Sequence, residues 1–405
     1  MNAQAEKRAS SRGKVFVVAT LDTKGREAAF VRDLLVEYGA PAQLVDAGCL
    51  APPVVPADVP RQQVLAAAGE DADKLAAAGD RGAAVSAAAR GAAAWIARAH
   101  AEGTVAGVIA IGGSAGTTIG TAAMRALPIG VPKVMVSTLA SGQVRHYVGD
   151  KDILMLNSIV DISGLNRVTR EVLGEAARAM AGMVTLDKGD AGADARPLVA
   201  ATMFGVTTPC VERARAVLEQ AGYEVLVFHA TGSGGQAMES LVRDGLIAGV
   251  LDITTTELAD ELVGGVPQVV SVGATDMVNF HAPESVPEKF QGRTFNRHNP
   301  SVTLMRTTSE ECAAIGEDIG RKLSTATGPV SVLLPSGGVS AIDRAGQPFD
   351  DPAARRALFE AIRRAGPRLD VRQMELHIND PRFATAMAER LLELMRAPAM
   401  QARAI

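Results

Sequence analysis

Residues 105–118 read VAGVIAIGGSAGTT, and this stretch combines the features that decide the fold. Its first seven residues form an apolar run rich in β-branched side chains, which is typical of a strand covered by helices on both faces. A turn rich in glycine follows, and apolar residues at helical spacing then run from Ile119 to Leu127. A buried strand that leads through a tight turn into a helix indicates a βαβ unit and a parallel sheet.

The same alternation extends through the whole chain. In the first half the pattern predicts strands over residues 15–20, 43–45, 105–111 and 133–136, and helices over 27–38 and the Ala-rich region 64–102. In the second half it predicts strands over residues 198–202, 224–228, 248–253, 268–271, 330–334 and 371–376, and helices over 211–220 and 383–395. We therefore predict an α/β protein with two Rossmann-like subdomains, each a mostly parallel sheet flanked by helices.

Composition also divides the chain. Residues 188–196 include a short polar, Gly-rich segment that is typical of a linker. We predict a disordered start over residues 1–13, an N-terminal α/β ATP-binding subdomain over 14–187 and a C-terminal α/β subdomain over 197–405. The halves begin alike, which fits either an internal duplication or the general similarity of βαβ units.

Charge and cysteine content exclude several classes of protein. The net charge is −4 with no basic face, so nucleic acid is not an expected partner. The three cysteines, Cys49, Cys210 and Cys312, lack metal or disulfide spacing, and the histidines form no metal site by spacing. No apolar run is long enough to cross a membrane and no signal peptide is recognisable, so we expect a cytoplasmic protein without a membrane partner.

Ligands of open parallel sheets bind beyond the carboxyl ends of the strands, so the loops there hold the candidate residues. Glycine lets the backbone approach an anion, hydroxyls donate hydrogen bonds, and a helix N-terminus supplies free N–H groups. A tight turn capped by threonine is the alternative interpretation. The first-half candidates after the 105–111 strand are Gly112, Gly113, Ser114, Gly116, Thr117 and Thr118.

Two neighbouring strand ends have a similar composition. Lys24 could pair with a phosphate, and Asp22 could hold a ribose hydroxyl or a magnesium ion, although helix capping by Asp22 or Thr23 would explain the same residues. The candidates at these two ends are Asp22, Thr23 and Lys24 after the first strand, and Ser137, Thr138, Ser141 and Gly142 after the 133–136 strand.

The second half contains a further polar loop after a strand, which predicts a second small-molecule cleft. Acidic residues such as Glu257 at a helix start are also explained by the helix dipole alone. No catalytic residue can be named from the sequence. The candidates for the second cleft are Thr231, Gly232, Ser233, Gly234 and Glu257.

Several motifs resemble the Tm-one-like ATP-binding domain family: ATLDTKG at residues 19–25, GGSAGT at 112–117, VPKVMVST at 131–138, DISGLNR at 161–167, MFGVTTPC at 203–210, LADEL at 258–262 and HINDP at 377–381. The resemblance covers the chain after residue 13. It implies a two-subdomain α/β fold, ATP as ligand with or without Mg²⁺, and a homodimer. It assigns ATP first to the 112–117 loop, with Asp22, Thr23 and Lys24 beside it. Relatives have a longer segment where Gly264-Gly265 here runs directly into Val266-Pro267.

Three functions remain open at this point. The chain could be an ATP-dependent enzyme with a second substrate, a non-catalytic nucleotide sensor that binds a protein partner, or a binder of another phosphorylated metabolite. Turnover of ATP distinguishes the first two, and competition between ATP and sugar phosphates tests the third.

Overall fold

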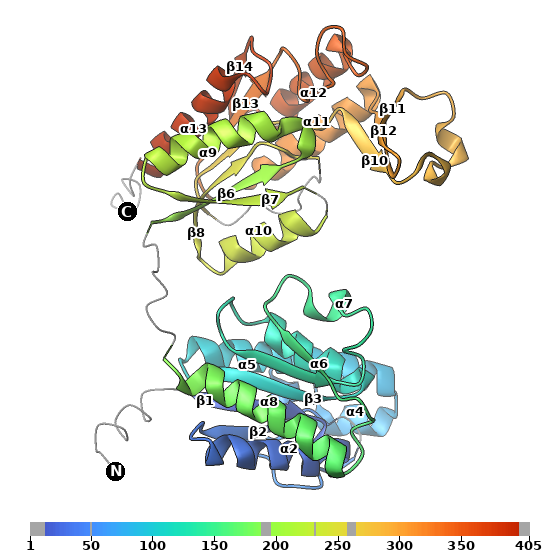
Figure 1. Ribbon diagram of the computed structural model, residues 1–405, viewed down its shortest axis with the longest axis vertical. Helices are drawn as coiled ribbons and strands as arrows, with labels where there is room; N and C mark the ends of the chain where they lie inside the picture. The colour runs from blue at the N-terminus through green and yellow to red at the C-terminus, as the bar shows by residue number, and fades with distance from the viewer. Residues whose placement is uncertain (1–12, 49–50, 188–195, 231, 257–264, 397–405) are drawn as a thin grey trace. The chain divides into compact units, whose positions relative to one another are not determined.

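The computed structural model describes residues 13–48, 51–187, 196–230, 232–256 and 265–396. The chain forms two compact units, Met1–Ala191 and Gly192–Ile405, and each is described here by itself (Figure 1). The predicted disordered start and the predicted linker lie outside the described residues, apart from Gly13 and Arg196. No helix in the described ranges is long and apolar enough to span a membrane.

The first unit is built on a sheet of five parallel strands. In order across the sheet they are β2 (Ala42–Asp46), β1 (Lys14–Ala19), β3 (Val105–Gly112), β4 (Lys133–Ser137) and β5 (Leu154–Asn157). Alternate residues of β1 enter two different cores, because successive strand side chains point to opposite faces. Val15 and Val17 pack with helices α2 (Leu21–Glu37) and α8 (Arg167–Thr185). Phe16 and Val18 pack on the other face.

That other face is covered by helices α3 (Arg61–Ala66), α5 (Arg81–Ala101) and α6 (Ser114–Arg125), with the short α4 (Ala72–Ala78) beside them and α7 (Arg145–Val148) after β4. The Ala-rich region over residues 64–102, predicted as largely helical, is thus covered by the three helices α3, α4 and α5. Gly79 ends α4 in the left-handed region at φ +65°, which an L side chain rarely adopts. The predicted 27–38 helix begins six residues earlier, at Leu21, and is kinked at Lys24.

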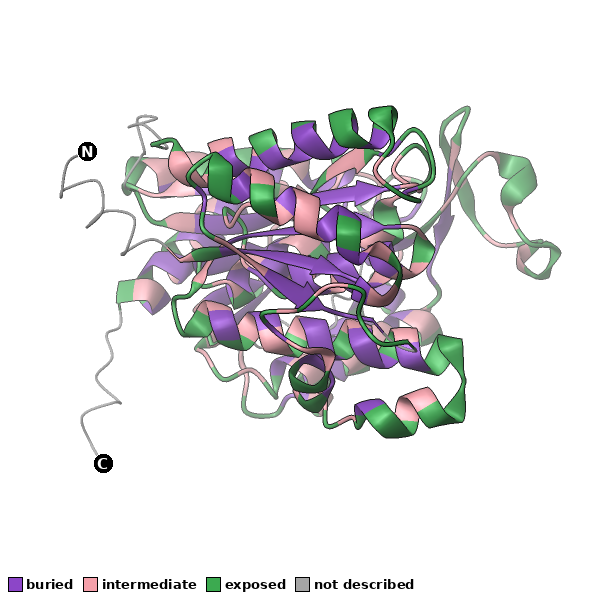
Figure 2. Ribbon diagram, turned by 90° about the horizontal axis from the view of Figure 1, so that it is seen from below, coloured by how far each residue is buried: buried purple, intermediate pink, exposed green. Residues whose placement is uncertain are grey.

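The second unit has a sheet of six parallel strands. In order they are β14 (Asp370–Met374), β13 (Val330–Pro335), β9 (Gln268–Val270), β8 (Ile247–Asp252), β6 (Leu198–Met203) and β7 (Glu224–His229). Helices α9 (Thr208–Gln220) and α13 (Pro381–Arg396) cover one face, and α10 (Ser233–Arg243), α11 (Ser309–Leu323) and α12 (Pro352–Ala365) cover the other. A single 3₁₀ turn, η1 (Gly205–Thr207), precedes α9. Figure 2 shows buried strands between helices whose outer faces are exposed.

A three-stranded antiparallel sheet, residues 277–306, extends from the second unit (Figure 1), and we call it the arm. Its elements are β10 (Met277–Phe280), η2 (Pro283–Ser285), η3 (Glu288–Phe290), β11 (Phe295–Asn299) and β12 (Val302–Arg306), with β12 in the centre. The sequence did not predict these strands. Most of β11 is exposed, so it has no apolar alternation to detect.

Helix α6 packs unusually close to β3 through glycine. A Cβ on Gly112 would lie 2.7 Å from the Cα of Gly116, and a Cβ on Gly120 would lie 2.4 Å from the Cβ of Ala110. Real carbon atoms do not approach so closely without a shift of the backbone. The glycines at these positions therefore set the distance between helix and sheet, as the third glycine of dinucleotide-binding fingerprints does.

We predict that Gly120→Ala lowers the free energy of unfolding of the first unit by about 1–3 kcal/mol, because the added methyl overpacks the contact with Ala110. Adding Ala110→Gly should restore most of the loss. Urea unfolding can be followed by the fluorescence of Trp95, the single tryptophan, which packs edge-to-face on Phe16 in this core. Gly182→Ala in α8 is the matched control, since its Cβ would meet only Leu186 at 3.8 Å and should stabilise the helix. Equal stability of Gly120→Ala and the wild type would contradict the close packing.

Candidate functional site

The strand order predicts a ligand crevice in the first unit. The chain runs from β1 to β2 on one side and then returns to β3 on the other side of β1. This is the 2-1-3-4-5 order of doubly wound folds, in which ligands bind at the carboxyl edge where the order reverses. The loops after β1 and after β3 flank that point, and the loop after β4 is the next neighbour. The three predicted loops therefore belong to one edge of one sheet.

The loop after β3 leaves a helix N-terminus open. Gly113 is the N-cap of α6, and no side chain caps the helix there. A Cβ on Gly113 would have Thr138 Oγ1, at 3.6 Å, as its nearest neighbour, so the space above this residue is unfilled. The first N–H groups of a helix have no intrahelical acceptor and carry the positive end of the helix dipole. An anion can therefore approach α6 at Gly113, next to the exposed Ser114.

The hydroxyls of Thr117 and Ser137, which the sequence offered as ligand donors, are used within the protein. Both residues are fully buried, and their hydroxyl oxygens lie 2.6 Å apart. Thr117 also bonds the carbonyl of Gly113 at 2.8 Å, and Ser137 accepts from the N–H of Leu139 at 2.9 Å. Thr118 donates to the carbonyl of Ser114. These bonds fasten the loops after β3 and β4 to each other.

The loop after β4 lies directly beside the Gly113 loop. The N–H of Thr138 donates to the carbonyl of Gly112 at 3.3 Å, and the N–H of Gly142 closes a turn on Leu139. Ser141 and Gly142 are exposed. Within the described chain, the Thr138 and Ser141 hydroxyls have no protein partner, so they can still donate to a ligand.

The loop after β1 supplies a positive charge. Thr20 and Thr23 bond to each other through their hydroxyls at 2.8 Å, while the Lys24 backbone leaves the helical region at φ −123°. Lys24 forms no ion pair with any described residue. No described carboxylate therefore competes for its ammonium group, and its pairing with a phosphate stays a prediction.

Asp22 lies on the β2 side of this loop, beside an acid that the sequence analysis did not select. A Cβ on Gly48 would lie 2.9 Å from Asp46 Oδ1 and 3.2 Å from Asp22 Oδ1, so the two carboxylates share this corner. Asp46 accepts from the N–H groups of Leu21 and Gly48. Burial, with a smaller contribution from Asp22, raises the pKa of Asp46. Asp22 Oδ1 is buried and has no hydrogen-bond partner among the described residues.

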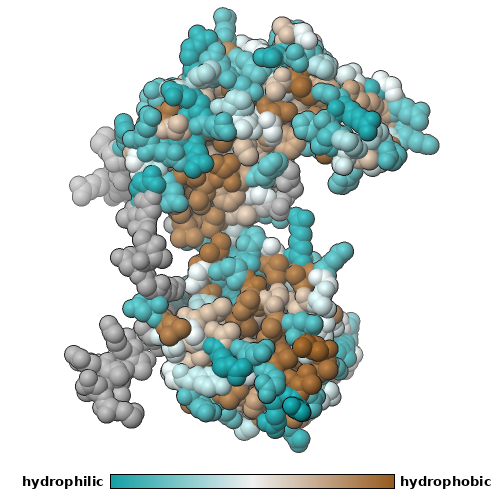
Figure 3. Space-filling model, viewed as in Figure 1, coloured by the Kyte–Doolittle hydropathy of each residue, from teal (hydrophilic) through white to brown (hydrophobic). Residues whose placement is uncertain are grey.

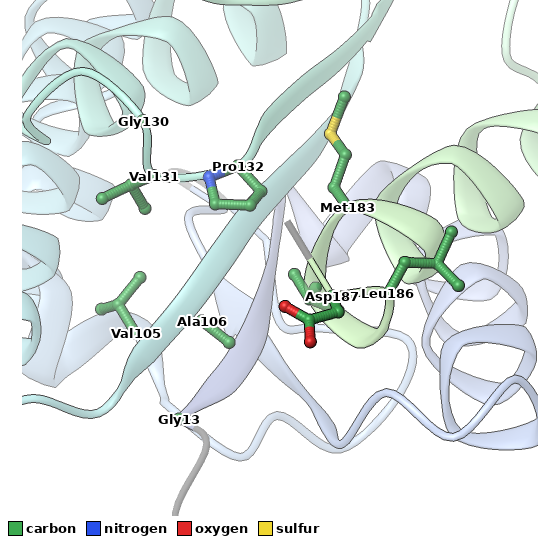
Figure 4. Close-up of a pocket in the computed structure, with 10 residues that line it drawn as sticks. Gly13, Val105, Ala106, Gly130, Val131, Pro132, Met183, Leu186 and Asp187 are labelled. Atoms are coloured by element: carbon green, nitrogen blue, oxygen red, sulfur yellow. The ribbon is translucent and has the colours of Figure 1, made fainter. Parts of the chain in front are cut away.

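A cavity of about 330 Å³ lies at the opposite, amino edge of this sheet (Figure 4). Val105, Pro132, Met183 and Leu186 give it a mostly apolar lining, and Asp187 contributes a carboxylate. Because β3 and β4 begin there, the cavity is a full strand length from the Gly113 loop. It belongs to a different edge and does not form part of the crevice.

The second unit repeats the strand order, with its reversal between β6 and β8. Here the crevice is filled by the protein's own hydrogen bonds. Thr202 donates to Asp252 at 2.6 Å and accepts from the N–H of Thr254 at 2.9 Å, and the hydroxyls of Thr254 and Thr207 lie 2.8 Å apart. All four side chains are buried. The same topology thus leaves a helix N-terminus uncapped in one unit and forms a closed polar network in the other.

The predicted second cleft is described only in part. Gly232 is exposed at the N-cap of α10, with φ +90°, and a Cβ on Gly234 would lie 2.0 Å from the carbonyl oxygen of His229. Gly234 is therefore required for packing. Thr231, Glu257 and the side chain of Ser233 lie outside the described residues, as does the 257–264 segment next to the short Gly265-Val266 connection. No group of three or more His, Cys, Asp or Glu side chains within the described ranges could hold a metal ion.

A buried charge cluster lies where the arm joins the second sheet. Asp276 accepts from Ser340 at 2.7 Å through Oδ2, while its Oδ1 is buried without a partner among the described residues. Asp343 lies 2.6 Å from Arg355 and 3.4 Å from Arg306. Burial, and then the charge of Asp343, raises the pKa of Asp276 to about 7. Four further elements supply the polar and charged groups around Asp276: Arg306 from β12, Cys312 from α11, Ser340 and Asp343 from the loop after β13, and Arg355 from α12.

We predict that Asp276 destabilises the folded state progressively as the pH rises. Below about pH 4 the acid is protonated in both the folded and the unfolded chain, so its ionisation does not change the free energy of unfolding. Between about 4 and 7 only the folded chain keeps the proton, and above 7 burying the charge has its full cost, of order 4 kcal/mol as an upper bound.

Asp276→Asn should therefore raise the free energy of unfolding at pH 8 and have much less effect at pH 5. Urea unfolding followed by circular dichroism measures this, while Trp95 fluorescence tracks the first unit separately. Asp318→Asn is the control. Hydrogen bonds from Lys322 and Arg321 lower the pKa of this partly exposed acid, so its removal should not raise the free energy of unfolding at pH 8. If Asp276→Asn raised the free energy of unfolding equally at pH 5 and at pH 8, the raised pKa of Asp276 would be contradicted.

Comparisons with known proteins agree with the division into two units. The N-terminal domain model of an uncharacterised protein family, UPF0261, matches residues 13–189, and its C-terminal domain model matches residues 196–395. A UPF0261 protein of Rhizobium meliloti is 48% identical over 92% of this chain and 97% of its own length, and one of Clostridium tetani is 45% identical over 94% and 99%.

The ToMV resistance protein Tm-1(GCR237) of Solanum lycopersicum is 44% identical over 78% of this chain and 45% of its own length. Among solved structures, the UDP-N-acetylglucosamine 2-epimerase from Rickettsia bellii aligns with 95% of this chain and 96% of its own, at a TM-score of 0.23 and 10% identity. Both domain models and the full-length bacterial relatives lead to one conclusion: this chain belongs to the UPF0261 family.

Proposed function

We propose that the first unit binds ATP in the crevice between the ends of β1 and β3. The observation that carries this proposal is the uncapped N-terminus of α6 at Gly113, which opens onto unfilled space beside Thr138. Phosphate is the anion for which such a helix end is best suited, because the N–H groups and the dipole act on the same atoms. The sequence motifs that resemble ATP-binding relatives fall on these same loops.

Each element of the crevice has a distinct role in this proposal. The N–H groups at the start of α6 and the hydroxyls of Ser114 and Thr138 would bind the phosphates. Lys24 would add a charge-assisted bond, which is about twice as strong as a neutral one. Asp22, whose Oδ1 lacks a partner among the described residues, would hold a ribose hydroxyl or a magnesium ion that also contacts the phosphates.

The proposal includes no reaction. The described residues include no nucleophile beside a base in this crevice. Another phosphorylated metabolite would use the same phosphate contacts, so competition experiments must accompany the ATP titration. The homodimer and the cytoplasmic location remain predictions from the resemblance and the sequence.

We predict that Gly113→Asp reduces ATP affinity at least 100-fold in isothermal titration calorimetry, measured with and without Mg²⁺. The new carboxylate would enter the space assigned to phosphate, and like charges at ~4 Å repel by up to about 4 kcal/mol near a protein surface. The variant should fold, because φ at Gly113 is −82° and Asp is a better N-cap than Gly. Lys24→Ala should cost about tenfold.

Gly113→Asn is the matched control, since it has the same shape without the charge. It should bind ATP better than Gly113→Asp by at least tenfold. If both variants bind ATP as the wild type does, the crevice assignment is wrong. If glucose 6-phosphate or another sugar phosphate displaces ATP and binds more tightly than ATP does, the ligand is a phosphorylated metabolite and ATP is secondary.

A further inference from the structure

The arm contains a cavity of about 480 Å³ that has no part in the proposed nucleotide site. It lies against the three-stranded sheet and the segment with η2 and η3, and its walls include Val286 and Phe295 together with two prolines. This volume is within the range of pockets that hold small organic molecules. Figure 3 shows hydrophilic and apolar residues side by side on the visible surface of the arm.

One residue of the cavity wall, Thr303, has a buried hydroxyl without a partner among the described residues. Thr303 lies in the central strand β12 and is 4% exposed, and its Oγ1 makes no hydrogen bond with any described residue. Buried hydroxyls in folded proteins are nearly always satisfied, so an orphaned one needs an explanation. A polar atom of a bound molecule would satisfy it.

A cation lies next to this hydroxyl. Arg297 of β11 is the cross-strand neighbour of Thr303 and lines the same cavity. Neighbours in register on an antiparallel pair have their Cβ atoms about 5 Å apart, so one small group can contact both side chains. Arg297 forms no ion pair within the described part of the chain. Phe280 of β10 is the neighbour of Thr303 on the other side of β12.

From these features we propose that the arm is a binding site for a small organic anion, with a carboxylate or similar group on an apolar ring or short chain. The anionic group lies between the Arg297 guanidinium and the Thr303 hydroxyl, and the apolar body contacts Val286 and Phe295. Glu288 also lines the cavity and opposes the anion. The two charged residues therefore have opposite effects on affinity, which a merely structural role would not produce.

The experiment uses the full chain and two fluorinated probes of the same shape, 4-(trifluoromethyl)benzoate and its neutral amide, titrated by ¹⁹F NMR. The benzoate should saturate one site per chain and bind at least tenfold more tightly than the amide. Arg297→Gln should abolish this preference. Glu288→Gln should strengthen benzoate binding severalfold, and Thr303→Val should weaken it severalfold without loss of stability.

Arg356→Gln on α12, an exposed arginine outside the cavity, is the control and should change nothing. The proposal is overturned if neither probe saturates, if benzoate and amide bind equally, or if Arg297→Gln and Glu288→Gln shift the affinity in the same direction. It is also overturned if affinity falls as protein concentration rises, because a second copy of the chain would then be the occupant of this surface.

Discussion

The first unit depends on how closely helix α6 can approach strand β3. Glycine at positions 112, 116 and 120 removes the side chains that would otherwise hold the helix away from the sheet. Because the helix lies so close, Thr117 can reach Ser137 at the end of β4 and bind the loops after β3 and β4 together. The first turn of α6 then opens onto the point where the strand order reverses. In the sequence these glycines would suggest simple flexibility. In the structure they set the distance between α6 and β3, and the positions of the loops at the strand ends follow from that distance.

The two units share one strand order but use it differently. In the first, the loops at the reversal keep a lysine, two hydroxyls and helix N–H groups available. In the second, Thr202, Asp252 and Thr254 bond to one another at the equivalent place and leave no open donor among themselves. The second unit has instead an insertion between β9 and β13 that forms the arm and α11. The charge cluster of Asp276, Asp343 and Arg306 joins that insertion to the sheet. The two units thus share one topology and differ in what lies between their later strands.

The sequence predicted the features that are local in the chain. Both sheets and the loops at their carboxyl edge follow from apolar runs and the residues just after them. Asp46 could have been found by the same rule, since it directly follows the strand predicted over residues 43–45. The sequence could not show that the Thr117 and Ser137 hydroxyls bond each other, because their pairing depends on the helix-to-sheet distance. Nor could the sequence show that Asp276 lies in a charge cluster, because the members of that cluster come from segments far apart in the chain. The arm was missed because an exposed strand such as β11 lacks alternation, and Thr231 and Glu257 lie outside the described residues.

The position of β1 within its sheet has a consequence for how the chain folds during synthesis. β1 leaves the ribosome well before β3, yet it lies between β2 and β3, and Val15 pairs with Gly107. At roughly 5–20 residues per second, the strand waits several seconds for that neighbour. Until then one of its hydrogen-bonding edges is unpaired, and its pairing partner is non-local, which makes closure slow. The Ala-rich helices α4 and α5, which form from local contacts, emerge during this interval. We expect them to be structured before the sheet closes, while one edge of β1 is still exposed to pairing with other chains.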